Sequence, residues 1–408
     1  MDVTAKRQET QTHRAPHMEI GLSFFAFILI GANDGALGVL LPSLRAHYHI
    51  DDATIGLVFF ASAIGYLLSS FNNGPIIERL GNRRALMLGS ALFVVTAVGI
   101  SFMPPFPLLL IIMLFLGAAV ASLDAGLNAY IASLPNNTTW LNYLHAFYGV
   151  GAWLGPALAS ILLALSWGWN HVYLIWAGVS LLVLIGLLTI FKQQPSRQRV
   201  EGEKQGHLMV MTLKLRVVWL AAILLLFYTG TEVSIGSWSY TLLTEGRHGA
   251  PLISGWIVSG YWLGLTLGRV ALGHVAQKVG QARLIQASLL VVILGLLLVW
   301  FAPVEAVSAV GLFITGFGLG PIFPTVIALT STLVSARILP AAVGFLASFA
   351  SAGASLFSWL AGNIAQHISL SALLPYEIAL TLCMIVLWIM LPKRPVNTSS
   401  GYDTMPQK

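Results

Sequence analysis

The sequence predicts an all-α membrane protein with twelve transmembrane helices in two similar six-helix halves. The composition is 57% hydrophobic and only 9% charged, with a mean hydropathy of +0.82, whereas an ordinary soluble domain carries about 25% charged residues. Twelve apolar runs are long enough for a bilayer core of about 30 Å, which takes about 20 helical residues to cross. A repeat at one fixed offset relates the two halves. Together these observations exclude a soluble protein.

The twelve runs are separated by polar breaks or by breaks rich in Pro and Gly. The first run follows a polar, basic tail, but it is too long for the apolar part of a signal peptide and no small-residue cleavage site follows it. We therefore expect it to be retained as a membrane span. The predicted spans are 20–44, 55–77, 85–103, 108–132, 141–165, 171–191, 217–243, 252–274, 284–302, 306–333, 341–366 and 373–391.

A polar stretch at 192–216 divides the spans six and six, and its composition predicts a flexible linker. The expected organisation is a tail at 1–19, a bundle at 20–191, the linker at 192–216, a bundle at 217–391 and a tail at 392–408.

The basic residues predict the orientation. With an even number of spans both termini lie on one side, and Lys and Arg near helix ends favour the cytoplasm. Placing the termini inside leaves only Arg45 and Arg247 outside. This predicts a multi-pass protein of a prokaryotic inner membrane with both termini cytoplasmic. The pI near 9.5 then reflects orientation and not a nucleic-acid partner. The single cysteine, Cys383, excludes an intramolecular disulfide and a Cys-based metal site.

An offset of 199 residues superposes six glycines of the first half on six of the second, where chance predicts roughly two matches. Duplicated six-helix halves are the layout of transporters that rock one bundle against the other around a site near the bilayer midplane. The glycine pairs are Gly31/Gly230, Gly56/Gly255, Gly65/Gly264, Gly74/Gly273, Gly81/Gly280 and Gly117/Gly316.

The same offset aligns two predicted cytoplasmic loops, with Gly74, Glu78, Arg79, Gly81, Arg83 and Arg84 in the first and Gly273, Lys278 and Gly280 in the second. The first loop resembles the Gly-x-x-x-Asp-Arg-x-Gly-Arg-Arg signature of the major facilitator superfamily, with Glu78 in place of Asp and Asn82 in place of one Arg, and the resemblance implies the major facilitator fold. A carboxylate and several guanidiniums at cytoplasmic helix ends can form charge-assisted bonds in one bundle arrangement that break in the other, so we expect these residues to form a cytoplasmic gate. The alternative is that these charges only fix orientation and cap helices.

The acids Asp34, Asp124 and Glu232 fall inside predicted spans. An acid at the centre of an inserted helix costs about 2.5–3.5 kcal/mol, so such residues face a water-filled pathway or a partner. Asp34 lies among glycines that leave room either for a ligand or for close helix packing. We expect the three acids to bind substrate or a coupling cation.

Polar neighbours extend these positions. Asn128 lies one turn after Asp124 on the same helix face, where the two can bind a hydroxylated ligand or form a structural hydrogen-bond pair. Tyr228 lies one turn before Glu232, and the pair predicts either a substrate or ion contact or a tether between bundles.

Five further candidates have plainer alternatives. Asn142 and His145 lie within one turn, with His145 able to titrate or merely to lie at the interface. Trp238 and Trp262 can stack on a sugar ring or form interfacial belts. Arg269 can neutralise an intramembrane acid, although snorkelling to the headgroups is the simpler interpretation.

Five segments form a recognisable set: Asp124-x-x-x-Asn128, Leu144-His145 with Gly149, Gly151, Ala152 and Pro156, Gly230-Thr-Glu232 with Trp238, Tyr261-Trp262-x-Gly264 with Gly268-Arg269, and Gly320-Pro321-Ile-Phe-Pro324. Together they resemble the fucose permease family within the superfamily, which includes a sodium-dependent glucose transporter branch. This resemblance implies symport of a sugar or similar polyhydroxylated solute with a cation. In that family the helix 1 acid lies one turn later, where this chain has Gly38. We expect the cation to be a proton rather than sodium, and the protein to be a monomer without cofactors.

Two other functions stay open. Gly151, Gly155 and Pro156 partly match an antiporter signature, with Ala159 and Ser160 in place of its last two glycines; this keeps proton-driven export of amphipathic drugs as the alternative. A membrane sensor or enzyme on the same scaffold is a third possibility, but the sequence lacks nucleophile, phosphate-loop and metal-cluster patterns. We therefore expect no enzyme activity and no metal.

Overall fold

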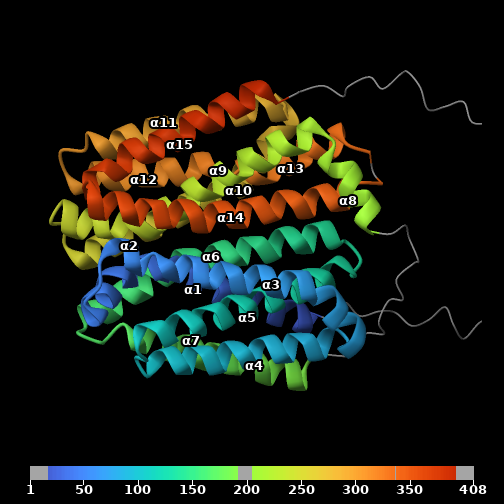
Figure 1. The fold of residues 1–408 in the computed structure, drawn as a ribbon, viewed down its shortest axis with the longest axis horizontal. Helices are drawn as coiled ribbons and strands as arrows, with labels where there is room; N and C mark the ends of the chain where they lie inside the picture. The colour runs from blue at the N-terminus through green and yellow to red at the C-terminus, as the bar shows by residue number, and fades with distance from the viewer. Residues whose placement is uncertain (1–16, 192–204, 336, 392–408) are drawn as a thin grey trace, which may run out of the picture.

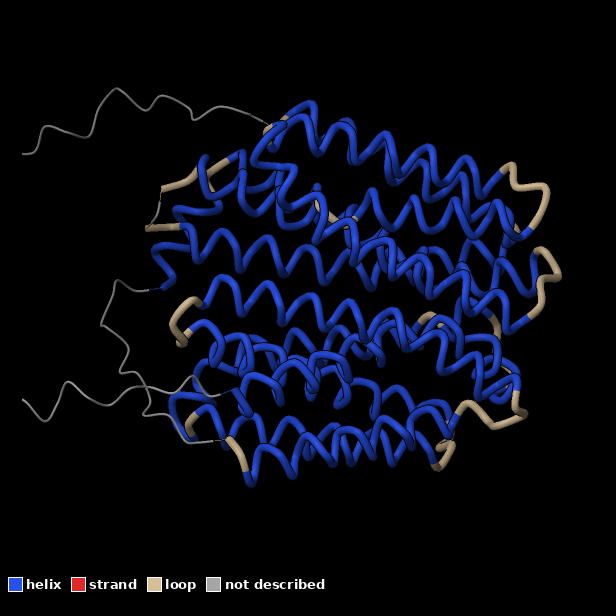
Figure 2. The backbone as a smooth tube through the Cα atoms, turned by 180° about the vertical axis from the view of Figure 1, so that it is seen from behind, coloured by secondary structure: helices blue, strands red, loops and turns tan. Residues whose placement is uncertain are grey.

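The computed structural model describes residues 17–191, 205–335 and 337–391, and these form helices joined by short loops (Figures 1 and 2). Within this part of the chain, eleven helices are long and apolar enough to cross a membrane. A further long helix, α10 (Pro251–Val279), occupies the remaining predicted span. The prediction of an all-α, multi-pass membrane protein is confirmed.

The first half forms the lower layer of Figure 1, coloured blue to green. Each predicted span is covered by a helix or, for the second span, by two. The helices are α1 (His17–Tyr48), α2 (Asp52–Ile55), α3 (Leu57–Leu80), α4 (Asn82–Ser101), α5 (Phe106–Ala132), α6 (Asn137–Ala164) and α7 (Asn170–Thr189).

The second half forms the upper layer, coloured yellow to red. Its described helices are α8 (Gln205–Leu213), α9 (Arg216–Thr241) continued by the π-turn η2 (Leu242–Gly246), α10, α11 (Gln281–Trp300), α12 (Glu305–Leu319), α13 (Ile322–Leu333), α14 (Leu339–His367), η3 (Leu370–Ala372) and α15 (Leu373–Met390). Figure 1 places α8 at one end of the long helices and α2 at the other, and these are called the α8 end and the α2 end below.

The structure differs from the predicted spans in three places. The span expected at 306–333 is divided into α12 and α13 at Gly320 and Pro321, because proline supplies no N–H to continue the helix. The span expected at 55–77 is divided at Gly56. Within the predicted linker, residues 205–213 form α8, while 192–204 lie outside the described residues.

Close helix contacts reproduce the sequence repeat. At four glycines an added Cβ would lie 1.7 to 2.3 Å from a carbonyl oxygen of the neighbouring helix, so only glycine permits these approaches. The glycine–carbonyl pairs are Gly65–Leu114 and Gly117–Ser62 between α3 and α5, and Gly264–Phe313 and Gly316–Tyr261 between α10 and α12. Adding 199 to each number of the first two pairs gives the other two, so the halves share one packing plan.

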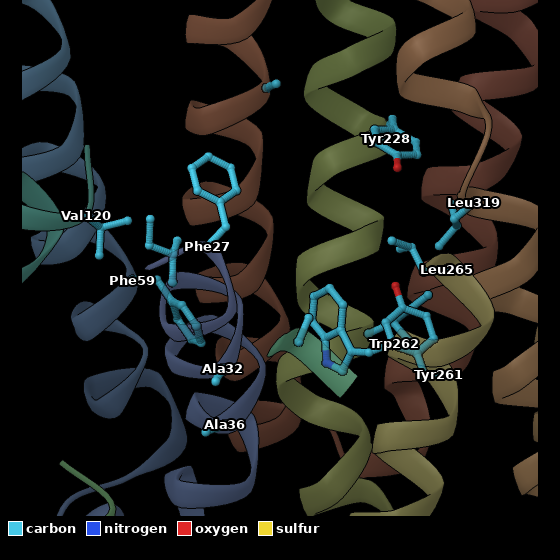
Figure 3. Packing of buried hydrophobic residues seen from close by; sticks show 14 of the residues in the cluster. Phe27, Ala32, Ala36, Phe59, Val120, Tyr228, Tyr261, Trp262, Leu265 and Leu319 are labelled. Atoms are coloured by element: carbon cyan, nitrogen blue, oxygen red, sulfur yellow. The ribbon is translucent and has the colours of Figure 1, made fainter. Parts of the chain in front are cut away.

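The share of buried residues differs between helices. In α1 and α9, 67% of the apolar window is buried, compared with 33% in the segment that contains α3. Figure 3 shows buried aromatic and aliphatic side chains on both sides of the boundary between the halves, with Phe27 and Phe59 from the first half and Tyr228 from the second. Large apolar side chains on the outer helices, such as Val95 of α4, are exposed, as lipid contact requires.

Candidate functional site

The first polar cluster is in the first half, between α3 and α5. The hydroxyl of Tyr66 donates to Asp124 Oδ2 at 2.7 Å, and Asn128 Nδ2 donates to Asp124 Oδ1 at 2.8 Å. Asp124 and Asn128 therefore share one helix face, as their spacing predicts. Both side chains are only partly buried, so a small ligand can still reach their free hydrogen-bonding positions.

Asp34 lies in the middle of α1 and faces α6. It accepts hydrogen bonds from the Tyr148 hydroxyl at 3.0 Å and from Asn33 Nδ2 at 3.2 Å. Asp34 is nevertheless solvent-exposed, although α1 contacts α5, α6, α7, α9 and α10. A helix enclosed by five others has little lipid-facing surface, so we infer that the carboxyl opens onto water-accessible space between the halves. Asp34 is also within electrostatic range of Asp124.

The second half supplies an ion pair. Arg269 Nη2 of α10 lies 2.9 Å from Glu232 Oε1 of α9 and 3.4 Å from the Tyr228 hydroxyl. Tyr261 donates to the backbone oxygen of Glu232 at 2.7 Å, and Figure 3 shows Tyr228 and Tyr261 on these neighbouring helices. Arg269 thus neutralises an intramembrane acid, and snorkelling, the simpler interpretation, is wrong for this structure.

The polar residues of the first half approach the Arg269–Glu232 pair of the second half where α6 contacts α10. An added Cβ at Gly149 would lie 2.3 Å from Thr266 Oγ1, and Arg269 follows Thr266 by one helical turn. His145, one turn before Gly149, is exposed and lies within electrostatic range of both Asp124 and Arg269. One turn earlier, toward the α8 end, Asn142 is also exposed.

The two candidate tryptophans are not exposed to this space. Trp238 is 2% exposed, and its Nε1 donates to the Ser358 oxygen at 2.8 Å, which ties α9 to α14. Trp262 is 4% exposed and packs against Gly236, since an added Cβ there would lie 2.4 Å from the indole ring. Its Nε1 has no hydrogen-bond partner within the described residues.

The predicted gate residues lie at the α8 end. Arg83 Nε donates to the Leu187 oxygen at 3.1 Å, which ties the start of α4 to α7 of its own half. Gly81 and Gly280 follow α3 and α10 with φ of 80° and 86°, a conformation almost restricted to glycine. Gly74, Glu78, Arg79, Arg84 and Lys278 are exposed, Gly273 lies in α10, and the gate role itself stays a prediction.

An ion cluster at the α2 end joins the two halves and was not predicted. Arg45 of α1 bonds to Asp52 of α2 and, at 2.5 Å, to Glu245 of η2 in the other half. The Asp52 backbone N–H donates to Gln366 of α14 at 3.2 Å. The repeat contained a usable signal, because Arg45 moved by 199 falls beside Glu245. Helices α1 and α9 are equivalent under the repeat, and α1 meets η2, the continuation of α9, at the α2 end.

A fourth intramembrane acid was also missed. Glu377 of α15 lies inside the predicted span 373–391, is 4% exposed and accepts a hydrogen bond from the Ser234 hydroxyl of α9. Its Oε2 is buried with no partner among the described residues. A search of the last span for carboxylates would have found it.

Known proteins match most of the length of this chain. A yeast relative, Bypass of stop codon protein 6 of Saccharomyces cerevisiae, is 25% identical over 396 residues, covering 88% of this chain and 79% of its own length. The glucose/mannose transporter GlcP of Bacillus subtilis is 23% identical over 348 residues, covering 82% of this chain and 85% of GlcP.

Solved structures share the fold. The nucleoside transporter NupG, solved as a point mutant, has a TM-score of 0.79 at 13% identity, and the match covers 92% of this chain and 99% of NupG. The E. coli fucose:proton symporter FucP, also solved as a point mutant, has a TM-score of 0.64 at 15% identity, and the match covers 93% of this chain and 98% of FucP. The Major Facilitator Superfamily profile matches residues 23–249 and again 220–405. With both halves matched, the chain belongs to the Major Facilitator Superfamily.

Proposed function

We propose that this protein is a secondary active symporter that moves a sugar or similar polyhydroxylated solute together with a proton by alternating access. The observation that carries the proposal is the set of acids and amides in the membrane interior: Asp34 and Asp124 with Asn128 in one half, facing the Arg269–Glu232 pair in the other. Amides and carboxylates bind hydroxyl groups, and a carboxyl in a low-dielectric site is a reversible proton carrier.

The contacts between the halves support an arrangement closed at the α2 end. Arg45 bonds to Glu245 there, and the ring of Phe60 packs edge-on against Trp359 of α14 at 5.5 Å. Asp34 and His145 are exposed, which fits access from the α8 end. The basic helix ends at the α8 end favour the cytoplasmic side of a prokaryotic inner membrane, and on that assignment we propose that this arrangement is inward-facing.

The relatives support the substrate class. GlcP is described as a glucose/mannose transporter and FucP as a fucose:proton symporter, and the interior of this chain offers hydrogen-bonding groups of the kind that such solutes need. The proposal includes a working monomer, with no cofactor or nucleic-acid partner.

Uptake into proteoliposomes tests the proposal. Purified protein should accumulate radiolabelled hexoses or pentoses when a pH gradient is imposed, and a sodium gradient alone should not replace it. Asp124→Asn should abolish accumulation and keep part of the solute exchange, while Asp51→Asn, the same chemical change in the loop between α1 and α2, should accumulate like the wild type. Unchanged accumulation by Asp124→Asn would remove this residue from the mechanism.

The alternative is proton-driven export of drugs, which rests on the partial antiporter signature in α6. Helix packing alone explains two glycines of that signature. An added Cβ would lie 2.1 Å from the Ile28 oxygen of α1 at Gly151, and 2.3 Å from the Ala32 oxygen at Gly155. Drug susceptibility of cells with and without the protein separates the two functions: an importer should leave it unaltered, and an exporter should reduce it.

A further inference from the structure

Tyr148 occupies a fixed position at the boundary between the halves. Its hydroxyl donates to Asp34 Oδ2 at 3.0 Å. Its backbone is pressed against α1, since an added Cβ at Gly31 would lie 2.0 Å from the Tyr148 carbonyl oxygen. With the main chain held on α1 in this way, the ring has little freedom to move away from Asp34.

The same turn of α6 faces the second half. Gly149, the next residue, packs on Thr266 of α10 with no room for a side chain. One turn beyond Thr266 is Arg269, which holds Glu232 at 2.9 Å. The Tyr148 hydroxyl is within electrostatic range of both Glu232 and Arg269. The hydroxyl therefore bonds to a carboxyl of its own half and lies within the electric field of an ion pair in the other half.

We propose that Tyr148 is a positioning residue that links the Asp34 carboxyl to the Arg269–Glu232 ion pair across the boundary. While Asp34 is ionised, the hydroxyl donates to it as a charge-assisted hydrogen bond. When Asp34 takes up a proton that bond weakens, and the hydroxyl dipole reorients in the field of the Arg269–Glu232 pair without movement of the ring. By reciprocity, the state of the ion pair changes how tightly Asp34 binds its proton.

Other charged groups face this link and set its surroundings. Asp124 acts on Asp34 from α5, and His145 lies one turn before Tyr148 and within range of Arg269. Neither of these two interactions involves the Tyr148 hydroxyl. Removing only that hydroxyl therefore tests the proposed link without changing the charges of Asp124 and His145.

The first experiment needs no substrate. Infrared titration of purified protein follows the carboxyl band of Asp34, identified as the band lost in Asp34→Asn. Tyr148→Phe should shift its proton-binding curve by at least about tenfold in proton concentration, because the ionised carboxyl loses a charge-assisted hydrogen bond. Tyr143→Phe is the matched control, since Tyr143 lies on the same helix and is 51% exposed. An unshifted curve in Tyr148→Phe overturns the proposal.

A mutant cycle tests the connection itself. Glu232→Gln should shift the Asp34 curve by about fivefold in the wild type and by less than about twofold in a Tyr148→Phe background. If the shift is equal in both backgrounds, the hydroxyl is not the link. Arg269→Lys, which keeps the charge, replaces Glu232→Gln in the cycle if that variant does not purify as a single species.

The transport readout rests on the proposed function. Tyr148→Phe should reduce pH-driven accumulation at least about tenfold and solute exchange less than about threefold. If the hydroxyl only bound the solute, its removal would reduce both activities equally. An equal reduction would therefore contradict the inference. If the wild type accumulates no solute, the proposed function fails, and the infrared cycle still decides the role of Tyr148.

Discussion

Glu245→Gln should weaken closure at the α2 end. In the structure Arg45 lies 2.5 Å from Glu245 across the boundary between the halves, with side-chain exposures of 22% and 35%. A buried charge-assisted hydrogen bond contributes about 1.5–3 kcal/mol, but a pair this exposed is screened by water and contributes about 1 kcal/mol. Loss of that energy changes the ratio of closed to open molecules by about fivefold. Arg45 keeps Asp52, so no charge is left unpaired.

The assay is the distance between spin labels at the α2 end. Phe102 and Ile368 are 79% and 72% exposed and lie just after α4 and α14, so cysteines there, in a Cys383→Ser background, report separation of the halves. Glu245→Gln should enrich the longer distance about fivefold. Glu305→Gln is the control, because Glu305 accepts from the Ala250 N–H within one half. If the two variants give the same distance distribution, the ion cluster does not hold the halves together.

Two further predictions concern stability, each read as thermal unfolding of purified protein. Gly31→Ala should destabilise by about 1–3 kcal/mol, because its Cβ would lie 2.0 Å from the Tyr148 oxygen, while Gly21→Ala in the same helix, with nothing within 4 Å, should be neutral or slightly stabilising; equal melting temperatures would contradict the packing argument. Hydrogen bonds from Thr54 lower the pKa of Asp51, which caps α2. The cap therefore contributes its full stability above the pKa of an unfolded Asp, about 3.9. This contribution is lost as the pH falls through the lower pKa of Asp51 in the folded protein. Asp51→Ala should lower Tm by about 1–2 °C at neutral pH. The difference should vanish in acid, and a difference that persists there would refute the assignment.

The fold was largely predictable because its signals are local or periodic. Apolar length fixes each span, and the offset of 199 residues fixes the duplication that the paired glycine contacts reproduce. The break between α12 and α13 was missed because a window of mean hydropathy registers Gly320 and Pro321 only weakly, although proline supplies the physical reason for the break.

Single candidate residues of the site could be chosen from the sequence, but their network could not. An acid in an apolar run is visible in sequence, so Asp34, Asp124 and Glu232 were chosen as candidates, and their roles stay predictions. Their partners were harder to find, because contacts such as Tyr66 with Asp124 join residues 58 positions apart and depend on helix rotation. Arg269 was underestimated for the same reason, since depth alone does not show which carboxylate a long side chain reaches.

Backbone-to-backbone packing of α1 against α6 also limits how the molecule can move. Added Cβ atoms at Gly31, Gly35, Gly151 and Gly155 would all lie 2.0 to 2.4 Å from main-chain oxygens of the opposite helix. Two helices whose backbones are in close contact at four levels form one rigid unit, so Asp34 and Tyr148 move together during transport. In the other half, Gly353 of α14 packs on the Leu226 oxygen of α9, which forms a similar closely packed helix pair. Movement should therefore occur between the α1–α6 pair and the α9–α14 pair. The distance between two probes on the same pair should stay constant, and it provides a reference for measuring that movement.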